Sequence, residues 1–83
     1  YPSAGSVFRN PENMYAGALI ENCGLKGKKR GDAQISDKHA NFIVNKDQAK
    51  SKDIKYLMDL AKNKVKKQYK VDLLIEQELF NWE

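Results

Sequence analysis

One stretch decides the fold: residues 51–69, which read SKDIKYLMDLAKNKVKKQY. Its apolar side chains recur at the three- and four-residue spacing of one helical face: Ile54, Leu57, Met58, Ala61, Val65 and Tyr69. Lysines occupy the opposite face, and Ser51 is a residue type that commonly precedes the first turn as N-cap. The stretch therefore predicts a long amphipathic helix.

A second, shorter helix is predicted upstream of this one. Ala16, Leu19, Ile20 and Cys23 stand at i, i+3, i+4 and i+7, which forms one apolar stripe. Gly24 follows, where a left-handed residue commonly ends a helix. The pattern indicates a helix of about ten residues.

The remaining sequence favours extended structure. The alternation in Ser6–Asn10 predicts a strand with Ser6, Phe8 and Asn10 on one face, which Pro11 ends. Residues 25–36 contain glycines and basic residues, so we expect a loop with short extended pieces.

Two more extended segments lie further along the chain. His39–Asn45 is rich in β-formers, and extended geometry would put His39, Asn41 and Ile43 on one face. Residues 71–80 mix β-formers with acids and predict a final strand.

These elements predict an α+β fold, with a small antiparallel or mixed sheet packed against two main helices. With 83 residues, the chain is long enough for one hydrophobic core, so residues 1–83 are expected to form a single domain. Aliphatic and aromatic residues make up 41% of the chain and recur at structured spacings, which argues against disorder.

Composition excludes several classes of protein. No apolar run approaches the roughly 20 residues that span a bilayer, so we expect no membrane partner. Cys23 is the single cysteine and is expected to pack as a small apolar residue. One cysteine allows neither an internal disulfide nor a thiolate-rich metal site, and it favours the reducing cytoplasm.

The net charge of +4 comes largely from two lysine-rich stretches, residues 26–30 and 50–70. They are consistent either with a solvated helix face or with a small basic module that binds an anionic partner such as RNA. Nucleic-acid readers usually interleave aromatic residues with the basic ones or carry a recognised motif, and this sequence has neither. We therefore expect no nucleic-acid partner and keep the basic module as the alternative.

Few side chains could carry chemistry. The candidates are Ser6, Asn10, His39, Glu76 and Glu78. None stands at a spacing typical of a metal site or a catalytic triad, and Ser6 has no neighbouring base that would make it a nucleophile. From these residues alone, the sequence indicates only a small soluble α+β domain.

A long motif at the start of the chain adds a more specific indication. Residues 2–11, PSAGSVFRNP, are similar to the Pro-Ser-Ala-Gly-Ser-x-Phe-Lys-Asn-Pro motif of the UDP-N-acetylenolpyruvoylglucosamine reductase (MurB) family. Further blocks follow in the family's order at residues 16–21, 24–27, 31–45 and 49–53. The sequence resembles the family over essentially its whole length, in the shorter form that has no large insertion between Ser6 and Ala16.

The resemblance implies an oxidoreductase of peptidoglycan precursor synthesis. Such an enzyme reduces the enolpyruvyl ether of UDP-N-acetylglucosamine to the lactyl ether of UDP-N-acetylmuramate, with NADPH as reductant and FAD as the resident cofactor. Hydride reaches the terminal enolpyruvyl carbon, and the carbanion left at the second carbon takes up a proton.

The resemblance also assigns roles to residues. Ser6 matches the serine that donates this proton, and the glutamate that stabilises the carbanion falls on Glu76 by its spacing from His39. The family continues Glu-Val-Arg where this chain has Glu76-Gln77-Glu78, so Glu78 is the alternative. Asn10 and His39 match positions that contact the UDP-sugar.

The chain begins Tyr1-Pro2 without a methionine, so we expect it to be part of a longer protein. By the resemblance it is the C-terminal, substrate-binding domain, and the FAD-binding domains lie upstream. We expect the 83-residue chain alone to bind neither FAD nor NADPH and to be inactive as a reductase.

Overall fold

A computed structural model describes residues 3–75 of the chain, and the side chains from Ser6 onward. An antiparallel sheet is combined with two helices, as expected of an α+β domain, which confirms the predicted class. The elements are β1 (Ser3–Ser6), α1 (Ala16–Asn22), β2 (Lys29–Arg30), β3 (Ala33–Ile35), β4 (Phe42–Asn45) and α2 (Ser51–Tyr69).

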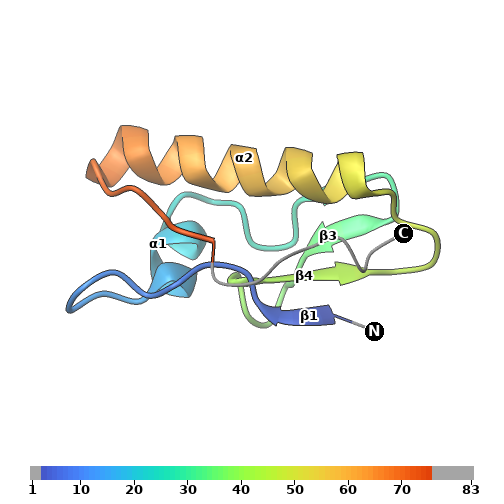
Figure 1. Cartoon of the computed structure of the whole chain (residues 1–83), viewed down its shortest axis with the longest axis horizontal. Helices are drawn as coiled ribbons and strands as arrows, with labels where there is room; N and C mark the ends of the chain where they lie inside the picture. Colours follow the sequence, from blue (N-terminus) through green and yellow to red (C-terminus); the bar gives the residue numbers. More distant parts are fainter. Residues whose placement is uncertain (1–2, 76–83) are drawn as a thin grey trace.

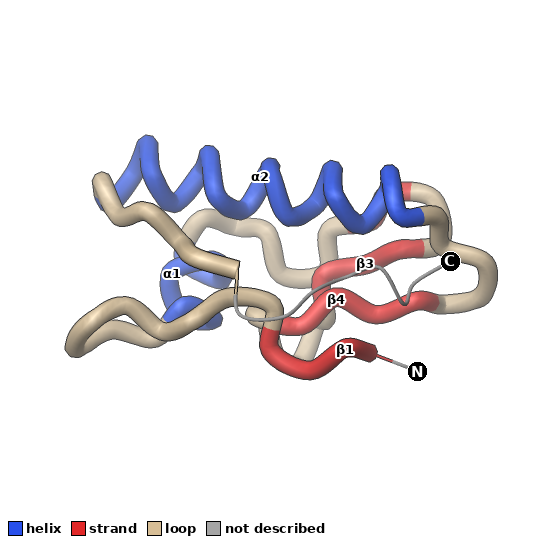
Figure 2. Tube along the Cα trace, in the orientation of Figure 1, coloured by secondary structure: helices blue, strands red, loops and turns tan. Residues whose placement is uncertain are grey.

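The strands form one antiparallel sheet in the order β1-β4-β3-β2. Figure 2 shows β1, β4 and β3 of this sheet. β2 and β3 are joined by a tight turn in which Gly31 has a φ of 58°, a left-handed conformation that favours glycine. These two strands confirm the short extended pieces expected in residues 25–36. β1 pairs with β4, so the start of the described chain lies at one edge of the sheet.

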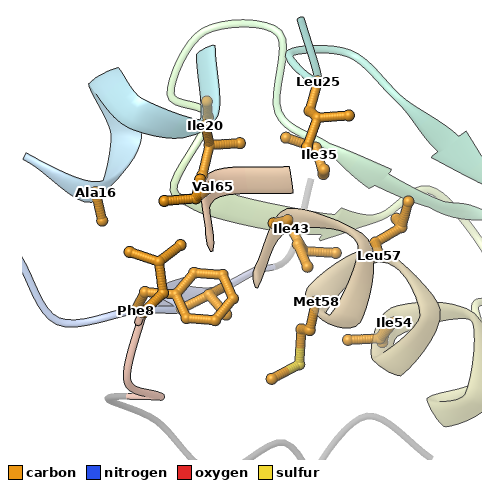
Figure 3. Close-up of a cluster of buried hydrophobic side chains, with 14 of the residues drawn as sticks. Phe8, Ala16, Ile20, Leu25, Ile35, Ile43, Ile54, Leu57, Met58 and Val65 are labelled. Carbon is orange, nitrogen blue, oxygen red and sulfur yellow. The ribbon is translucent and has the colours of Figure 1, made fainter. Parts of the chain in front are cut away.

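Helix α2 lies across one face of this sheet, and α1 packs beside it (Figure 1). The buried side chains of α2 include most of its predicted apolar face: Ile54, Leu57, Met58, Ala61 and Val65. They form one core with Ile35 and Ile43 of the sheet and Ile20 of α1 (Figure 3). The predicted orientation of the long helix is therefore confirmed.

The ends of the helices differ in detail from the prediction. α2 begins at Ser51, but the residue that caps it is the extended Lys50, and its side chain makes no capping hydrogen bond. α1 has seven residues rather than ten, because the chain leaves the helix at Cys23. Gly24 then adopts a φ of 77°, as its position after the helix predicted.

Cys23 is half-buried and packs against the core, as expected of a small apolar residue. Burial raises the pKa of its thiol, and the positive charge of Lys64 partly opposes that rise. The thiol therefore stays protonated at neutral pH.

The predicted strand over Ser6–Asn10 is wrong. β1 ends at Ser6, and the next two side chains, Val7 and Phe8, are both only 2% exposed. A regular strand would alternate them between faces. Both can be buried because the chain bends at Val7 and Phe8 then pairs with Ile75, near the end of the described residues.

The prediction for residues 39–45 holds in its second half only. β4 covers Phe42–Asn45, whereas His39 begins a turn in which its carbonyl accepts a hydrogen bond from the Phe42 N–H at 2.9 Å. This turn lets Ala40 and Ile43, three residues apart, both be buried. Of the final strand predicted over residues 71–80, the described part contains the Ile75 bridge, and residues 76–80 lie outside it.

Among the described residues, no helix is long and apolar enough to cross a membrane.

The long helix gives the first testable prediction. Leu57 is fully buried against the sheet, so Leu57→Ala should lower the free energy of unfolding of this chain by about 2–5 kcal/mol, through lost burial and the cavity left behind. Lys55→Ala, at an exposed position of the same helix, should change it by less than about 0.5 kcal/mol. Urea denaturation followed by circular dichroism measures both values, and equal losses would contradict the assigned faces.

Candidate functional site

Ser6 is half-buried and is the last residue of β1, directly opposite Phe42 of β4. The pairing before it is irregular, because Ser3 lies opposite Val44 and Ser6 lies opposite Phe42. Three residue steps on β1 therefore match two on β4, which is one extra residue. Such bulges commonly redirect a side chain beside a functional site.

Ser6 and Phe42 point to the face of the sheet away from α2. Ile43 pairs with Ile35, and both belong to the core beneath the helix. Side chains alternate along a strand, so Phe42 points to the opposite face. Directly paired residues share a face, so Ser6 joins Phe42 there.

His39 is exposed, and its ring packs on Phe42. The two ring centroids are 5.7 Å apart at an interplanar angle of 47°. The backbone N–H of His39 donates to Ser36 Oγ at 3.2 Å, which holds the turn. Phe42 is therefore both the strand partner of Ser6 and the ring neighbour of His39, and it links these two predicted site residues.

Asn10 is exposed and connects the loop after β1 to helix α1. Its Oδ1 accepts a hydrogen bond from the backbone N–H of Ala16 at 3.0 Å. This N–H is one of the helix-terminal donors that have no partner within the helix, so the contact acts as a cap supplied from six residues upstream. Because the oxygen faces the helix, Nδ2 is the atom that can donate to a ligand.

Sequence reasoning missed Asn41. Its Oδ1 accepts from the Phe8 N–H at 3.0 Å, and its Nδ2 donates to the Phe8 carbonyl at 2.9 Å. Its own carbonyl accepts from the Val7 N–H at 2.8 Å. The one available signal was its residue type, since an asparagine side chain has the same donor and acceptor groups as a peptide bond.

The end of the described chain runs beside the same loop. Phe8 and Ile75 form an antiparallel bridge, and the Arg9 N–H donates to the Leu74 carbonyl at 2.8 Å. Leu73 is buried in the core and fixes the start of this segment. Glu76 and Glu78, the predicted catalytic acid and its alternative, lie outside the described residues.

The basic surface is partly paired within the domain. Lys66 Nζ lies 2.9 Å from Asp72 Oδ2, and Lys26 Nζ lies 3.3 Å from Glu21 Oε1. The guanidinium of Arg30 lies 4.4 Å from the centre of the Tyr56 ring. In the part of the chain that the structure describes, no three histidine, cysteine, aspartate or glutamate side chains gather as metal ligands would.

Comparison with known proteins decides the family. Residues 1–80 match the family described as UDP-N-acetylenolpyruvoylglucosamine reductase, C-terminal domain. The chain belongs to this family. A MurB crystal structure from Thermus caldophilus matches 92% of the chain with a TM-score of 0.76 and 45% sequence identity.

Curated MurB relatives agree. UDP-N-acetylenolpyruvoylglucosamine reductase 2 of Symbiobacterium thermophilum is 52% identical over 80 residues, which is 96% of this chain and 26% of the relative. The reductase of Clostridium botulinum (strain 657 / Type Ba4) is 53% identical over 76 residues, which is 92% of this chain and 25% of the relative. The chain thus spans about a quarter of the length of the MurB proteins it matches, and 26% of the Thermus caldophilus chain.

The contact between Asn10 and helix α1 gives the second prediction. Asn10→Ala should lower the free energy of unfolding by about 1 kcal/mol, because the Ala16 N–H loses its acceptor. Asn10→Asp should retain most of the stability, since a carboxylate can accept the same hydrogen bond and is favourable near a helix N-terminus. Urea denaturation measures both. Asn63→Ala, at an exposed position of α2, is the control, and an equal loss in that variant would remove the capping role.

Proposed function

We propose that this chain is the substrate-binding, C-terminal domain of a reductase that converts UDP-N-acetylglucosamine enolpyruvate to UDP-N-acetylmuramate, a peptidoglycan precursor. One observation carries the proposal. The motif at residues 2–11 belongs to a chain of the MurB family, and its Ser6 is paired across the sheet with Phe42, whose ring contacts the ring of His39. The same motif supplies Asn10, which joins this strand to α1.

The reaction adds a hydride and a proton across the carbon–carbon double bond of the enolpyruvyl ether. NADPH, acting through FAD, supplies the hydride when both are bound to the whole enzyme. The N-terminus of α1 is a poor fit for a dinucleotide pyrophosphate, because this helix has only seven residues and Asn10 already occupies its Ala16 N–H. We therefore assign FAD and NADPH to domains upstream of this one, and the proton step to this chain.

Ser6 is the proposed proton donor. After hydride addition at the terminal carbon, the electron pair of the broken double bond resides on the carbon beside the carboxylate. The Ser6 hydroxyl transfers its proton to that carbon, and the resulting alkoxide regains a proton from solvent. A serine hydroxyl is a weak acid, but a carbanion is a strong base, so position matters more than acidity.

Glu76 is the proposed residue that stabilises the carbanion, with Glu78 as the alternative. It directly follows Ile75 in sequence, and Ile75 pairs with Phe8, two residues after Ser6. This pairing is the observation that supports the proposed role of Glu76. A carboxyl group near developing negative charge must be protonated or act through a water molecule.

Asn10 and His39 are proposed to contact the UDP-sugar. Asn10 would donate from Nδ2 to an acceptor on the substrate, because its Oδ1 bonds the Ala16 N–H. His39 is exposed and its ring contacts Phe42, the residue that is paired with Ser6.

The single cysteine of the sequence, Cys23, and a nucleotide-sugar substrate both favour a cytoplasmic location for the enzyme. None of the family matches supports the alternative of a basic module that binds RNA.

The third prediction concerns Ser6 in the full-length reductase. Ser6→Ala should slow reoxidation of the reduced flavin by the enolpyruvyl substrate by about 10²-fold to 10⁴-fold, because the proton donor is lost. Reduction of the flavin by NADPH is the internal control and should keep its rate. Ser6→Cys should retain more activity, since a thiol can also donate a proton. Stopped-flow absorbance separates the two half-reactions, and near-normal reoxidation in Ser6→Ala would remove Ser6 from the mechanism.

The fourth prediction separates the two acids. Glu76→Gln in the full-length reductase should lower kcat by at least about 10²-fold with little change in KM, because the group acts on the transition state. Glu78→Gln is the matched control and should leave kcat within about threefold of the parent enzyme. Steady-state kinetics with varied substrate measures both, and the reverse result would assign the role to Glu78.

A further inference from the structure

Asn41 contacts the two residues that follow Ser6 through three hydrogen bonds. Its side-chain amide pairs with both backbone groups of Phe8, at 3.0 and 2.9 Å, and its carbonyl accepts from Val7 at 2.8 Å. The side-chain amide thus extends the β1–β4 hydrogen bonding past the Ser6–Phe42 pair. At this point the partner chain is the turn that begins at His39 and precedes β4.

The backbone groups of Phe8 depend on this amide. On the other side of Phe8, the Arg9 N–H bonds to Leu74, which is the arrangement of a bridge whose central residues do not bond to each other. The N–H and C=O of Phe8 therefore point toward Asn41. Phe8 is only 2% exposed, and backbone groups left unpaired in such a place are destabilising.

The backbone of helix α1 lies close to Asn41 at Gly17. A Cβ added at Gly17 would stand 3.5 Å from the Cβ of Asn41, so the helix backbone approaches the asparagine without a side chain between them. The neighbouring residue, Ala16, is bonded to Asn10. Asn41 is thereby held between α1 and the loop that carries Ser6 and Asn10.

We propose that Asn41 is a positioning residue for Ser6. The bulge between Ser3 and Ser6 interrupts the regular pairing ahead of the serine. The direction of the Ser6 hydroxyl therefore depends on its pairing with Phe42 and on the Val7–Phe8 side, where Asn41 acts. In this proposal Asn41 acts through the backbone of Val7 and Phe8, to which its hydrogen bonds go. This inference rests on the proposed role of Ser6 as proton donor.

The test is a double-mutant cycle in the full-length reductase, with single-turnover reoxidation of the flavin by the enolpyruvyl substrate as readout. Asn41→Ala should slow this step by about 10²-fold, the size of effect that a misplacement of about 1 Å can have. The KM for the enolpyruvyl substrate, measured separately in the steady state, should stay within about threefold. In the Ser6→Ala background, the same change should slow reoxidation less than about threefold, because there is no longer a hydroxyl to position.

Two further variants make the result specific. Asn41→Asp keeps the acceptor for the Phe8 N–H and loses the donor to its carbonyl, so it should be slowed as well, and it replaces Asn41→Ala if that variant does not fold. Leu60→Ala, on α2, should destabilise the domain by partial loss of core packing and leave the reoxidation rate near that of the parent enzyme.

The outcomes distinguish the two proposals. If Ser6→Ala alone reoxidises normally, the proposed function of Ser6 fails, and the positioning role fails with it. If Ser6→Ala is slow but the Asn41 variants are not, or if their effect is undiminished in the Ser6→Ala background, only the positioning role of Asn41 is overturned. If flavin reoxidation in Leu60→Ala is as slow as in Asn41→Ala, the effect of Asn41 is explained by loss of stability, and its positioning role is also overturned.

Discussion

Burial of one face of α2 against the sheet is the interaction on which the rest of the domain depends. Ile54, Leu57 and Val65 are almost fully buried, and side chains of this kind contribute about 1.5–3 kcal/mol each when removed from water. A sheet with strands of two to four residues has little stability of its own. The helix supplies the apolar surface that these short strands need, so its contact with Ile35 and Ile43 sets which face of the sheet is inside.

That choice of face also determines where chemistry can occur. Because Ile43 points toward α2, its neighbour Phe42 must point away, and Ser6 follows because it is paired with Phe42. His39 reaches the same neighbourhood through its ring contact with Phe42. A core packing constraint at Ile43 thus sets the sheet face of Ser6 and of Phe42, the residue that His39 contacts.

The elements that could be predicted from the sequence are those in which apolar residues recur at a regular local spacing. α2 repeats its apolar spacing over 19 residues, and the pattern identified both its length and its buried face. The stretch after Ser6 could not be predicted in this way, because the backbone of Val7 and Phe8 pairs with residues more than 30 positions away, Asn41 and Ile75. Contacts between residues far apart in the sequence also form the candidate site. Ser6, Asn10 and His39 were candidates by residue type alone and received proposed roles only from the family resemblance, since the contacts that connect Ser6 and His39 to Phe42 leave no spacing in the sequence.

Two asparagine side chains supply backbone-like hydrogen bonds where regular structure ends. Asn10 satisfies a donor at the start of α1, and Asn41, directly before the first residue of β4, satisfies both groups of Phe8. A regular strand would have satisfied these groups without side chains, but it would also have alternated Val7 and Phe8 and removed the bend that follows Ser6. Side-chain amides allow the chain to turn at this point while its buried polar groups stay paired, which is how an irregular segment can hold a hydroxyl in a fixed direction.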